Sequence, residues 1–209
     1  MPSRRYEDNV FINCPFDAPY QAMFDALVFA IHDAGFIARC AREVGNPTEA
    51  RLKRIIRIIA ECRYGIHDIS RTNLDSRILL PRFNMPFELG LFLGCKEFGL
   101  SAHIKKACLV LDTLPYRHQR ILSDIAGHDD VFPHGGRPQV AIRGVRDWLR
   151  STSNRKNIPG AATIWERYIK FRKELPPICR RLKIRPTELI FLDFTSIVTE
   201  WLRENALWG

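Results

Sequence analysis

The sequence predicts an α/β fold in which a parallel sheet carries helices on both faces. Short apolar segments alternate with longer segments whose apolar residues recur at helical spacing, which is the pattern of βαβ units. Several of the short segments end on polar residues, as strands do when they lead into a ligand site at the carboxyl edge of an open sheet. After residue 150 the helical patterns continue without strands, so we expect a small helical appendage.

The first strand and helix are predicted within residues 9–35. Residues 9–14 form a short apolar segment that stops at the turn-rich loop 15–19. Residues 20–33 have apolar positions at helical spacing, and Gly35 ends this predicted helix.

The second unit begins with a strand at 36–40, which a Gly-Asn-Pro sequence follows. Thr48 can cap a helix over 49–61, where isoleucines and a leucine recur at helical spacing among lysines and arginines. The third strand is predicted at 64–69, and residues 71–83 have the composition of a polar, irregular loop.

The segment from Asn84 to Phe98 has the features of a helix that opens a site. Asn84 is its predicted N-cap, Pro86 suits the first turn, and Glu88 lies near the positive end of the helix dipole. The expected buried side of this helix consists of Phe87, Leu91 and Leu93.

A fourth strand is predicted at 106–112, and it again ends on an aspartate. A short helix at 116–125 and a longer one at 138–149 follow it. These elements complete the unit that we assign to residues 1–150, an α/β domain.

A linker and a helical appendage are predicted beyond this domain. Residues 151–160 have linker composition, and residues 161–209 form the appendage. Its helices are expected at 162–175 and 188–202, with two prolines after the first and a short helix at 178–182. Its many aromatic residues favour a packing or homo-oligomer surface over a DNA-binding helix-turn-helix.

The composition, with 46% hydrophobic and 26% charged residues, is that of an ordinary globular protein. No apolar run approaches the roughly 20 residues of a membrane span, and the N-terminus does not have the pattern of a signal peptide, so we expect a cytoplasmic protein with no membrane partner. The net charge of +9 indicates a solvated basic face more than a nucleic-acid partner. The six cysteines have no CxxC spacing and are expected to be reduced, with no metal bound.

Polar residues follow three of the predicted strands and open the helix after the third strand. Because the carboxyl ends of parallel strands share one edge, we expect these side chains to converge on a cleft. A carboxylate with an apolar surround and like-charged neighbours has a raised pKa, and it can act as a nucleophile or stabilise a cation. Neither the glycine-rich dinucleotide motif nor a P-loop is present. The candidates are Asn13, Asp17, Asp68, Ser70, Asn84, Glu88 and Asp112.

Three motifs occur in order along residues 9–150: NCPFD at 13–17, DIS at 68–70 and FELG at 87–90. Together they resemble the nucleoside 2-deoxyribosyltransferase and TIR-like superfamily. In that superfamily a Pro-Phe loop follows the first strand, an aspartate follows a later strand, and a glutamate at a helix start is catalytic. The resemblance implies a flavodoxin-like sheet and cleavage of the N-glycosidic bond of a nucleoside or of NAD, with Glu88 at the ribose.

The resemblance also implies a ligand arrangement, with NAD as substrate and no separate cofactor. Glu88 would stabilise an oxocarbenium-like state, Asp68 and Asn84 would hold ribose hydroxyls, and Phe16 would stack on the base. Arg82 lies in an arginine-containing loop that suits a phosphorylated ligand. Many bacterial relatives are antiphage defence proteins that consume NAD or convert it into a signal, which implies a partner effector protein. The remaining substrate-binding candidates are Asn13, Asp17 and Ser70.

A second hypothesis is a nucleotide sensor that keeps the cleft but does no chemistry. The second family aspartate, shortly before the glutamate, is replaced by Asn84 or absent, which favours the sensor, whereas Glu88 favours the enzyme. Each candidate also has a simpler structural interpretation, as a dipole-satisfying carboxylate, a turn residue, an N-cap, a solvated arginine or a packing aromatic.

Overall fold

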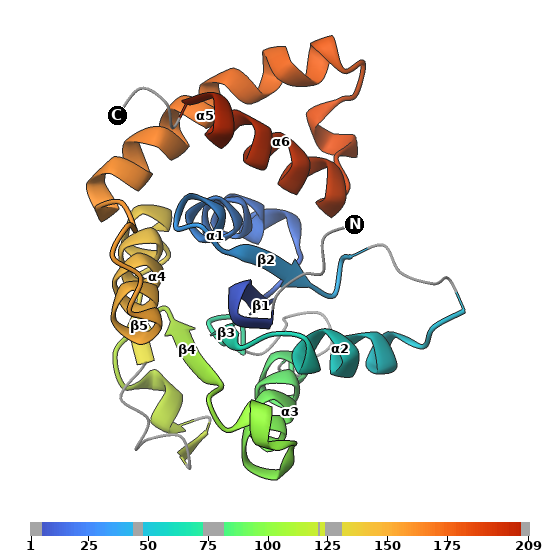
Figure 1. Ribbon diagram of the computed structural model, residues 1–209, viewed down its shortest axis with the longest axis vertical. Helices are drawn as coiled ribbons and strands as arrows, with labels where there is room; N and C mark the ends of the chain where they lie inside the picture. Colours follow the sequence, from blue (N-terminus) through green and yellow to red (C-terminus); the bar gives the residue numbers. More distant parts are fainter. Residues whose placement is uncertain (1–5, 44–47, 73–81, 121, 124–130, 206–209) are drawn as a thin grey trace.

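The computed structural model describes residues 6–43, 48–72, 82–120, 122–123 and 131–205. These residues form a five-stranded, all-parallel sheet in the order β2-β1-β3-β4-β5, which is the strand order of a flavodoxin-like fold. The predicted α/β class and the four predicted strands are confirmed (Figure 1). The strands are β1 (Asn9–Asn13), β2 (Ile37–Cys40), β3 (Tyr64–Asp68), β4 (Ala107–Asp112) and β5 (Val131–Pro133).

Helices cover both faces of the sheet (Figure 1). α1 and α4 pack together on one face, α2 and α3 pack together on the other, and α5 and α6 lie outside α1. The helices are α1 (Gln21–Asp33), α2 (Arg51–Ala60), α3 (Asn84–Phe98), α4 (Pro138–Ser153), α5 (Ala161–Arg181) and α6 (Phe191–Asn205).

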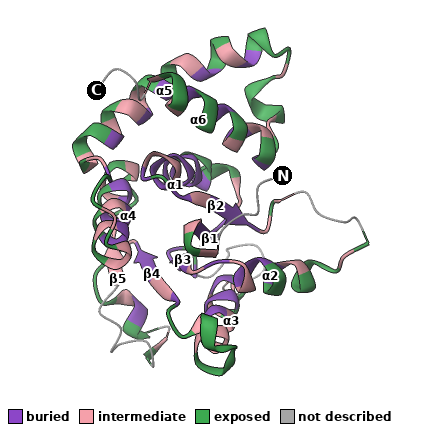
Figure 2. Cartoon of the chain, viewed as in Figure 1, coloured by how far each residue is buried: buried purple, intermediate pink, exposed green. Residues whose placement is uncertain are grey.

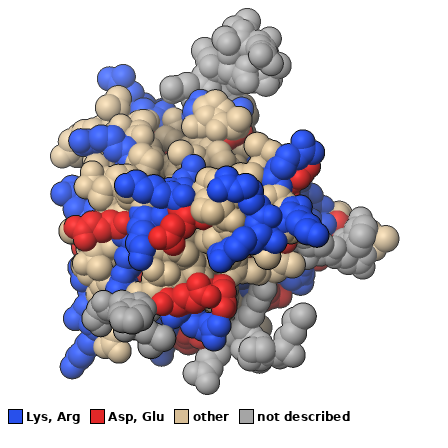
Figure 3. Space-filling model, turned by 90° about the horizontal axis from the view of Figure 1, so that it is seen from above, with Lys and Arg blue, Asp and Glu red and all other residues tan. Residues whose placement is uncertain are grey.

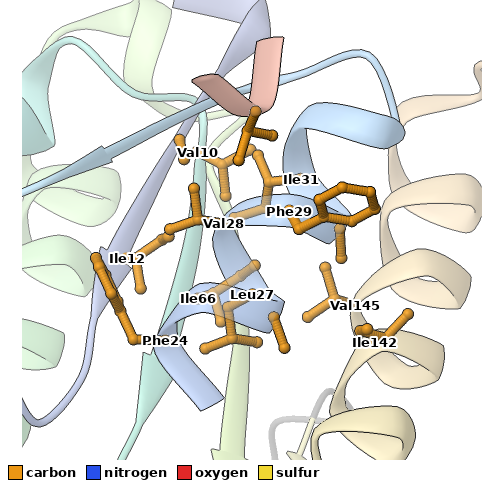
Figure 4. Packing of buried hydrophobic residues seen from close by; sticks show 14 of the residues in the cluster. Val10, Ile12, Phe24, Leu27, Val28, Phe29, Ile31, Ile66, Ile142 and Val145 are labelled. Atoms are coloured by element: carbon orange, nitrogen blue, oxygen red, sulfur yellow. The ribbon is translucent and has the colours of Figure 1, made fainter. Parts of the chain in front are cut away.

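β1 and β3, at the centre of the sheet, are buried along their whole length and so on both faces, as the core of a parallel sheet must be (Figure 2). Alternate side chains of β1 go to opposite faces: Val10 and Ile12 join the α1 and α4 side, whereas Phe11 packs with residues of α2 and α3. Figure 4 shows the first side, where Leu27 and Val28 of α1 meet the strands.

The predicted linker is shorter than expected, because α4 continues through Ser153 and not only to residue 149. The helix ends at Asn154, which has the left-handed conformation (φ 58°) that commonly closes a helix. The Ser151 and Ser153 hydroxyls donate to main-chain carbonyls one turn back, so these residues, typical of loops, are accommodated within the last turn.

The predicted break at the paired prolines is wrong, because α5 passes through Pro176 and Pro177 without interruption, and residues 178–181 belong to it. Each proline removes an amide donor and leaves the carbonyl four residues earlier without its helical partner. Arg172 and Lys173, which carry those carbonyls, are exposed, so water can replace the lost donors. Buried side chains on the opposite side of α5, such as Leu175, keep the helix on the core.

Two other elements differ from the sequence-based expectation. Of the helix predicted at 116–125, the described residues form a 3-10 turn at Arg117–Arg120. β5 was not predicted, since it has three residues and one is a proline. Most of the predicted loop 71–83, residues 73–81, lies outside the described residues.

The appendage shares the main hydrophobic core with the α/β domain. The Phe29 ring of α1 lies 5.3 Å from Phe171, 5.5 Å from Tyr168 and 5.8 Å from Trp201, measured between ring centroids. All four rings are buried. The appendage aromatics therefore pack within this chain, through α1.

The face above α5 and α6 carries many Lys and Arg side chains with acidic groups among them (Figure 3). Charged side chains of α5 and α6 also form ion pairs: Arg172 contacts Asp25 of α1, and Arg203 contacts Glu200. The pairing fits a solvated basic face. None of the helices in the described ranges combines the length and apolar character needed to cross a bilayer.

All six cysteines are free thiols, as expected. Cys14, Cys40, Cys62 and Cys179 are buried, while the other two are partly accessible. Burial raises the pKa of Cys40 and of Cys62 to about 12, which keeps them in the unreactive thiol form.

The contacts of Phe29 predict how strongly the appendage is attached. Phe29→Ala removes one ring from a buried cluster of four, so we expect a loss of about 3–5 kcal/mol in the free energy of unfolding. Urea denaturation measures it. Phe98→Ala is the control, because Phe98 is 92% exposed, and it should change stability by less than about 0.5 kcal/mol. Equal effects of the two changes would contradict the shared core.

Candidate functional site

The carboxyl edge of the sheet gathers the predicted polar residues, since strands β1, β3 and β4 end there. Asn13, Asp68 and Asp112 are the last residues of these strands, and all three are buried. Glu88 lies in α3, which packs against β1 and β3. Burial raises the pKa of the Cys14 thiol, and Asp68 and Glu88 both raise it further, which places this thiol within electrostatic range of both carboxylates.

Glu88 is buried because the packed side of α3 is not the predicted one. Phe87 is 55% exposed, whereas Glu88 is 3% exposed and lies on the same side as Met85, Leu89 and Phe92. Met85 and Phe92 are seven residues apart, which is about two helical turns, so both lie on the side of α3 that packs against the sheet. Glu88, three residues after Met85, lies on that same side, whereas Phe87 lies on the side that faces solvent.

The predicted capping role of Asn84 is also wrong. Phe83 occupies the N-cap position and makes no side-chain capping bond, while Asn84 is the first helical residue and is exposed. The first turn of α3 is instead held by a side chain of β1: the side-chain amide of Asn13 donates a hydrogen bond to the Met85 carbonyl at 2.8 Å.

The Glu88 carboxylate has one cationic neighbour among the described residues. Nη2 of Arg51, from α2, lies 3.5 Å from Glu88 Oε1. Burial raises the pKa of Glu88, and Arg51 partly offsets this. The Arg51 side chain is 58% exposed, so solvent reaches its guanidinium. A buried carboxylate with one long contact retains oxygen lone pairs for a ligand.

Asn13 joins this side of the edge to a buried histidine. Its Nδ2 lies 3.0 Å from His67 Nδ1, and the His67 ring packs against Phe11 and Phe92. An amide donor to Nδ1 assigns the imidazole proton to Nε2, which has no hydrogen-bond partner within the described part of the chain. Burial, followed by the charge of Lys106, lowers the pKa of His67 to about 3, so this histidine is neutral at pH 7.

Asp68 lies among partners from distant parts of the chain. Its Oδ2 accepts a hydrogen bond from the Tyr20 hydroxyl, its Oδ1 accepts from the Ser70 amide at 2.8 Å, and His134 Nε2 lies 3.1 Å from Oδ2. The Gly136 amide donates to His134 Nδ1 at 2.9 Å, which assigns the proton to Nε2; this nitrogen is close to Asp68 but makes no hydrogen bond within the described residues. Both oxygens of Asp68 are therefore engaged by the protein.

Arg117 ties the ends of β3 and β4 together. It donates to Asp112 Oδ1 at 2.7 Å and to the Ile69 carbonyl at 2.7 Å, and it also reaches the Thr72 hydroxyl at 3.1 Å. Sequence reasoning missed Arg117, Arg51, Tyr20 and His134 as members of the edge, because each belongs to another segment and carries no local motif.

The three remaining candidates form a separate group around the loop after β1. Asp17 accepts from the Tyr20 amide at 3.1 Å and pairs with Arg82 Nη1 at 2.8 Å. Phe16 packs edge-on against Phe24 at 5.5 Å between ring centroids. Arg82 thus links the segment before α3 to the loop after β1.

Chemically, the edge offers one buried, poorly solvated carboxylate, Glu88, beside an exposed cation, together with the carboxylates of Asp68 and Asp112, which the protein engages. Within the described residues, no group of three or more His, Cys, Asp or Glu side chains is arranged to hold a metal ion. Comparisons of the chain with protein-family models, with curated proteins and with solved structures found no match. The superfamily resemblance therefore rests on the three sequence motifs.

The buried His67 predicts a pH dependence of stability. The pKa of a histidine in the unfolded chain is about 6.5, and the folded value is lowered to about 3, so the unfolded state binds a proton first as the pH falls. The contribution of neutral His67 to the free energy of unfolding is therefore fully present above pH 6.5. Below that pH it is lost at about 1.4 kcal/mol per pH unit.

The variant His67→Gln keeps an acceptor for Asn13 but does not titrate. Urea denaturation of both proteins between pH 5 and 7.5 should show the stability advantage of the wild type over the variant shrinking below pH 6.5. His32, whose pKa is also lowered by burial, is present in both and cancels. A stability difference that does not vary with pH would rule out a buried neutral His67.

Proposed function

We propose that this protein is a TIR-like enzyme that cleaves the N-glycosidic bond of NAD or a related nucleotide, with Glu88 as the catalytic residue. The observation that carries the proposal is the burial of Glu88 (3% exposed) at the carboxyl edge, beside the exposed side chain of Arg51. A structural carboxylate satisfying the helix dipole would be expected in solvent, so its burial favours a functional role. The order of the three motifs supports the same activity.

Cleavage of an N-glycosidic bond develops positive charge on the ribose ring. A carboxylate that is already oriented and poorly solvated stabilises that charge strongly, or attacks the anomeric carbon to give a covalent intermediate. Arg51 lowers the pKa of Glu88 and so favours the ionised form needed for either role. Because Arg51 is largely exposed, a ligand phosphate can also pair with it.

The proposed cleavage is compatible with two activities: the protein could be an NAD glycohydrolase or a synthase of a nucleotide signal. In the second case a partner effector protein would respond to the signal, as in antiphage defence. We also propose that the protein acts in the cytoplasm and forms a homo-oligomer. Asn13, Asp17, Asp68, Ser70, Phe16, Arg82 and Asn84 remain the proposed substrate-binding residues.

A nucleotide sensor that does no chemistry is the second candidate function. This function is favoured by the hydrogen bonds that two candidate residues already make within the protein. The carboxylate oxygens of Asp68 accept from Tyr20 and Ser70, and the side-chain amide of Asn13 donates to the Met85 carbonyl. A site with its polar groups already paired can hold a ligand by shape and leave the bond intact.

Replacing the carboxylate tests the enzyme directly. Glu88→Gln keeps the shape but removes the charge, and electrostatic stabilisers of this kind contribute about 3–4 kcal/mol, so we expect a rate loss of roughly a hundredfold or more. Purified protein is incubated with NAD, with and without extract of phage-infected cells, and released nicotinamide is followed by chromatography.

The matched control is Glu97→Gln, on the same helix but with a side chain that is 65% exposed, and it should retain wild-type activity. Equal rates for Glu88→Gln and the wild type would remove Glu88 from the catalytic role. If the wild type binds NAD tightly but never cleaves NAD or a nucleoside, the sensor hypothesis replaces the enzyme hypothesis.

Removing the cation tests its influence on Glu88. Arg51→Ala deletes the group that offsets the raised pKa of Glu88, so this pKa should rise further and the acidic limb of the activity–pH profile should move to higher pH. Lys53→Ala, an exposed cation on the same helix, should leave the limb in place. An unshifted limb in Arg51→Ala would show that Glu88 and Arg51 are not coupled.

A further inference from the structure

The side of α3 that faces solvent is apolar, as its packed side is. Phe83 at the N-cap position, and Phe87 and Phe98 within the helix, are each exposed over more than half of their surface. Because they recur at the spacing of helical turns, they lie along one line on the helix surface. A helix that is apolar all round is normally buried all round, so this line of rings indicates that a partner covers it.

Two glycines lie along the same line, between Phe87 and Phe98. A Cβ atom added at Gly90 would meet nothing within 4 Å among the described residues, its own helix backbone aside, and one added at Gly94 would meet the Phe98 ring at 4.0 Å. The glycines therefore leave an open hollow between two protruding rings. We call these five residues the α3 stripe.

The rest of the described chain packs against other sides of α3. α2 contacts α3 through Leu91 and Cys95, which lie outside the α3 stripe. α5 and α6 lie over α1, on the opposite face of the sheet (Figure 1). The appendage that covers one helical layer thus leaves the outer surface of the other layer to a partner.

The order of residues along the α3 stripe is complementary to itself when it is reversed. When a second α3 runs antiparallel across the first, about a two-fold axis beside Gly90, Phe87 of each copy faces Gly94 of the other. In the same register, Phe83 of each copy faces Phe98 of the other. A ring fills a hollow at the first pair and two rings meet at the second, which is the self-complementarity that a two-fold interface requires.

The area and the charge of the α3 stripe also suit a second copy of the chain. An aromatic side chain buries about 150–250 Å², so the three rings offer roughly 300–500 Å² of the about 800 Å² that each partner buries in a stable interface. The charged residues of α3 are Glu88, which is buried, and Lys96 and Glu97, which pair with each other at 4.0 Å. Two copies of a chain with a net charge of +9 can therefore meet along this stripe without like charges facing each other.

We infer that the protein forms a two-fold dimer through the α3 stripes of two copies. The dimer gives the homo-oligomer of the proposed function its contact surface. It does not rest on the chemistry at Glu88, which lies on the packed side of the same helix. Because the interface is small, we expect a dissociation constant of roughly 10–100 μM.

Sedimentation velocity of the full-length protein, at concentrations from below to above this dissociation constant, tests the dimer. The mass should rise from that of a monomer to twice that value and no further. Phe87→Ala removes a ring and Gly94→Phe fills the hollow, so each should weaken the dimer at least tenfold. The matched control is Leu182→Ala, at an exposed apolar residue that follows α5, and it should dimerise like the wild type. A chain that stays monomeric at every concentration, a larger assembly, or wild-type dimerisation of both stripe variants would overturn the inference.

The double variant Phe87→Ala/Gly94→Phe tests the antiparallel register. It exchanges the positions of ring and hollow, which face each other in that register, so it should recover the dimer that Gly94→Phe alone loses. Circular dichroism of the dilute proteins verifies that each variant is folded. A folded double variant that does not recover would overturn the inference.

Two further variants separate the dimer from the fold and from the chemistry. Phe98→Ala should weaken the dimer but leave the unfolding of the protein at about 1 μM unchanged, because the dilute protein is monomeric and Phe98 is exposed there. Glu88→Gln should dimerise like the wild type, so loss of NAD cleavage and loss of the dimer are distinct results. Loss of the dimer in Glu88→Gln, or its full retention in Phe98→Ala, would contradict an interface along the α3 stripe.

Discussion

The geometry of the carboxyl edge depends on one buried amide. Asn13, at the end of β1, places its Nδ2 2.8 Å from the Met85 carbonyl and 3.0 Å from His67 Nδ1. This contact joins β1, β3 and the first turn of α3 where water is excluded, and leaving such a group unpaired costs about 1–3 kcal/mol. Glu88 lies three residues after Met85 in the same helix, so the amide fixes the depth at which the carboxylate sits.

Asp68 and Glu88, two of the buried carboxylates at this edge, differ because of what surrounds them. Asp68 receives hydrogen bonds from Tyr20 and Ser70 and faces His134, so it acts as a junction of the fold. Glu88 has only the distant, exposed guanidinium of Arg51 among the described residues. Desolvation without compensating donors raises the pKa and leaves lone pairs unused, which is the state expected of a group that meets charge only when a ligand binds.

α1 connects the two ends of the molecule. Tyr20, just before it, bonds to Asp68 at the carboxyl edge, while Asp33 at its other end pairs with Arg167 of α5. Between these points Phe29 packs into the aromatic cluster of the appendage. One helix thus contacts the sheet on one side and the appendage on the other, so α5 and α6 belong to the same core as the strands (Figure 1).

The strand–helix order, the parallel sheet and the strand ends that carry Asn13 and Asp68 could be predicted from the sequence, because apolar periodicity and turn residues act over short distances. The burial of Glu88 and the exposure of Phe87 could not be predicted, since the packed side of a helix depends on the surface that it meets. The partners of the buried carboxylates and the continuity of α5 through its prolines likewise depend on contacts within the folded protein. Contacts between segments more than 30 residues apart, such as Arg51 with Glu88, leave no local pattern, because they form only once the sheet has brought those segments together.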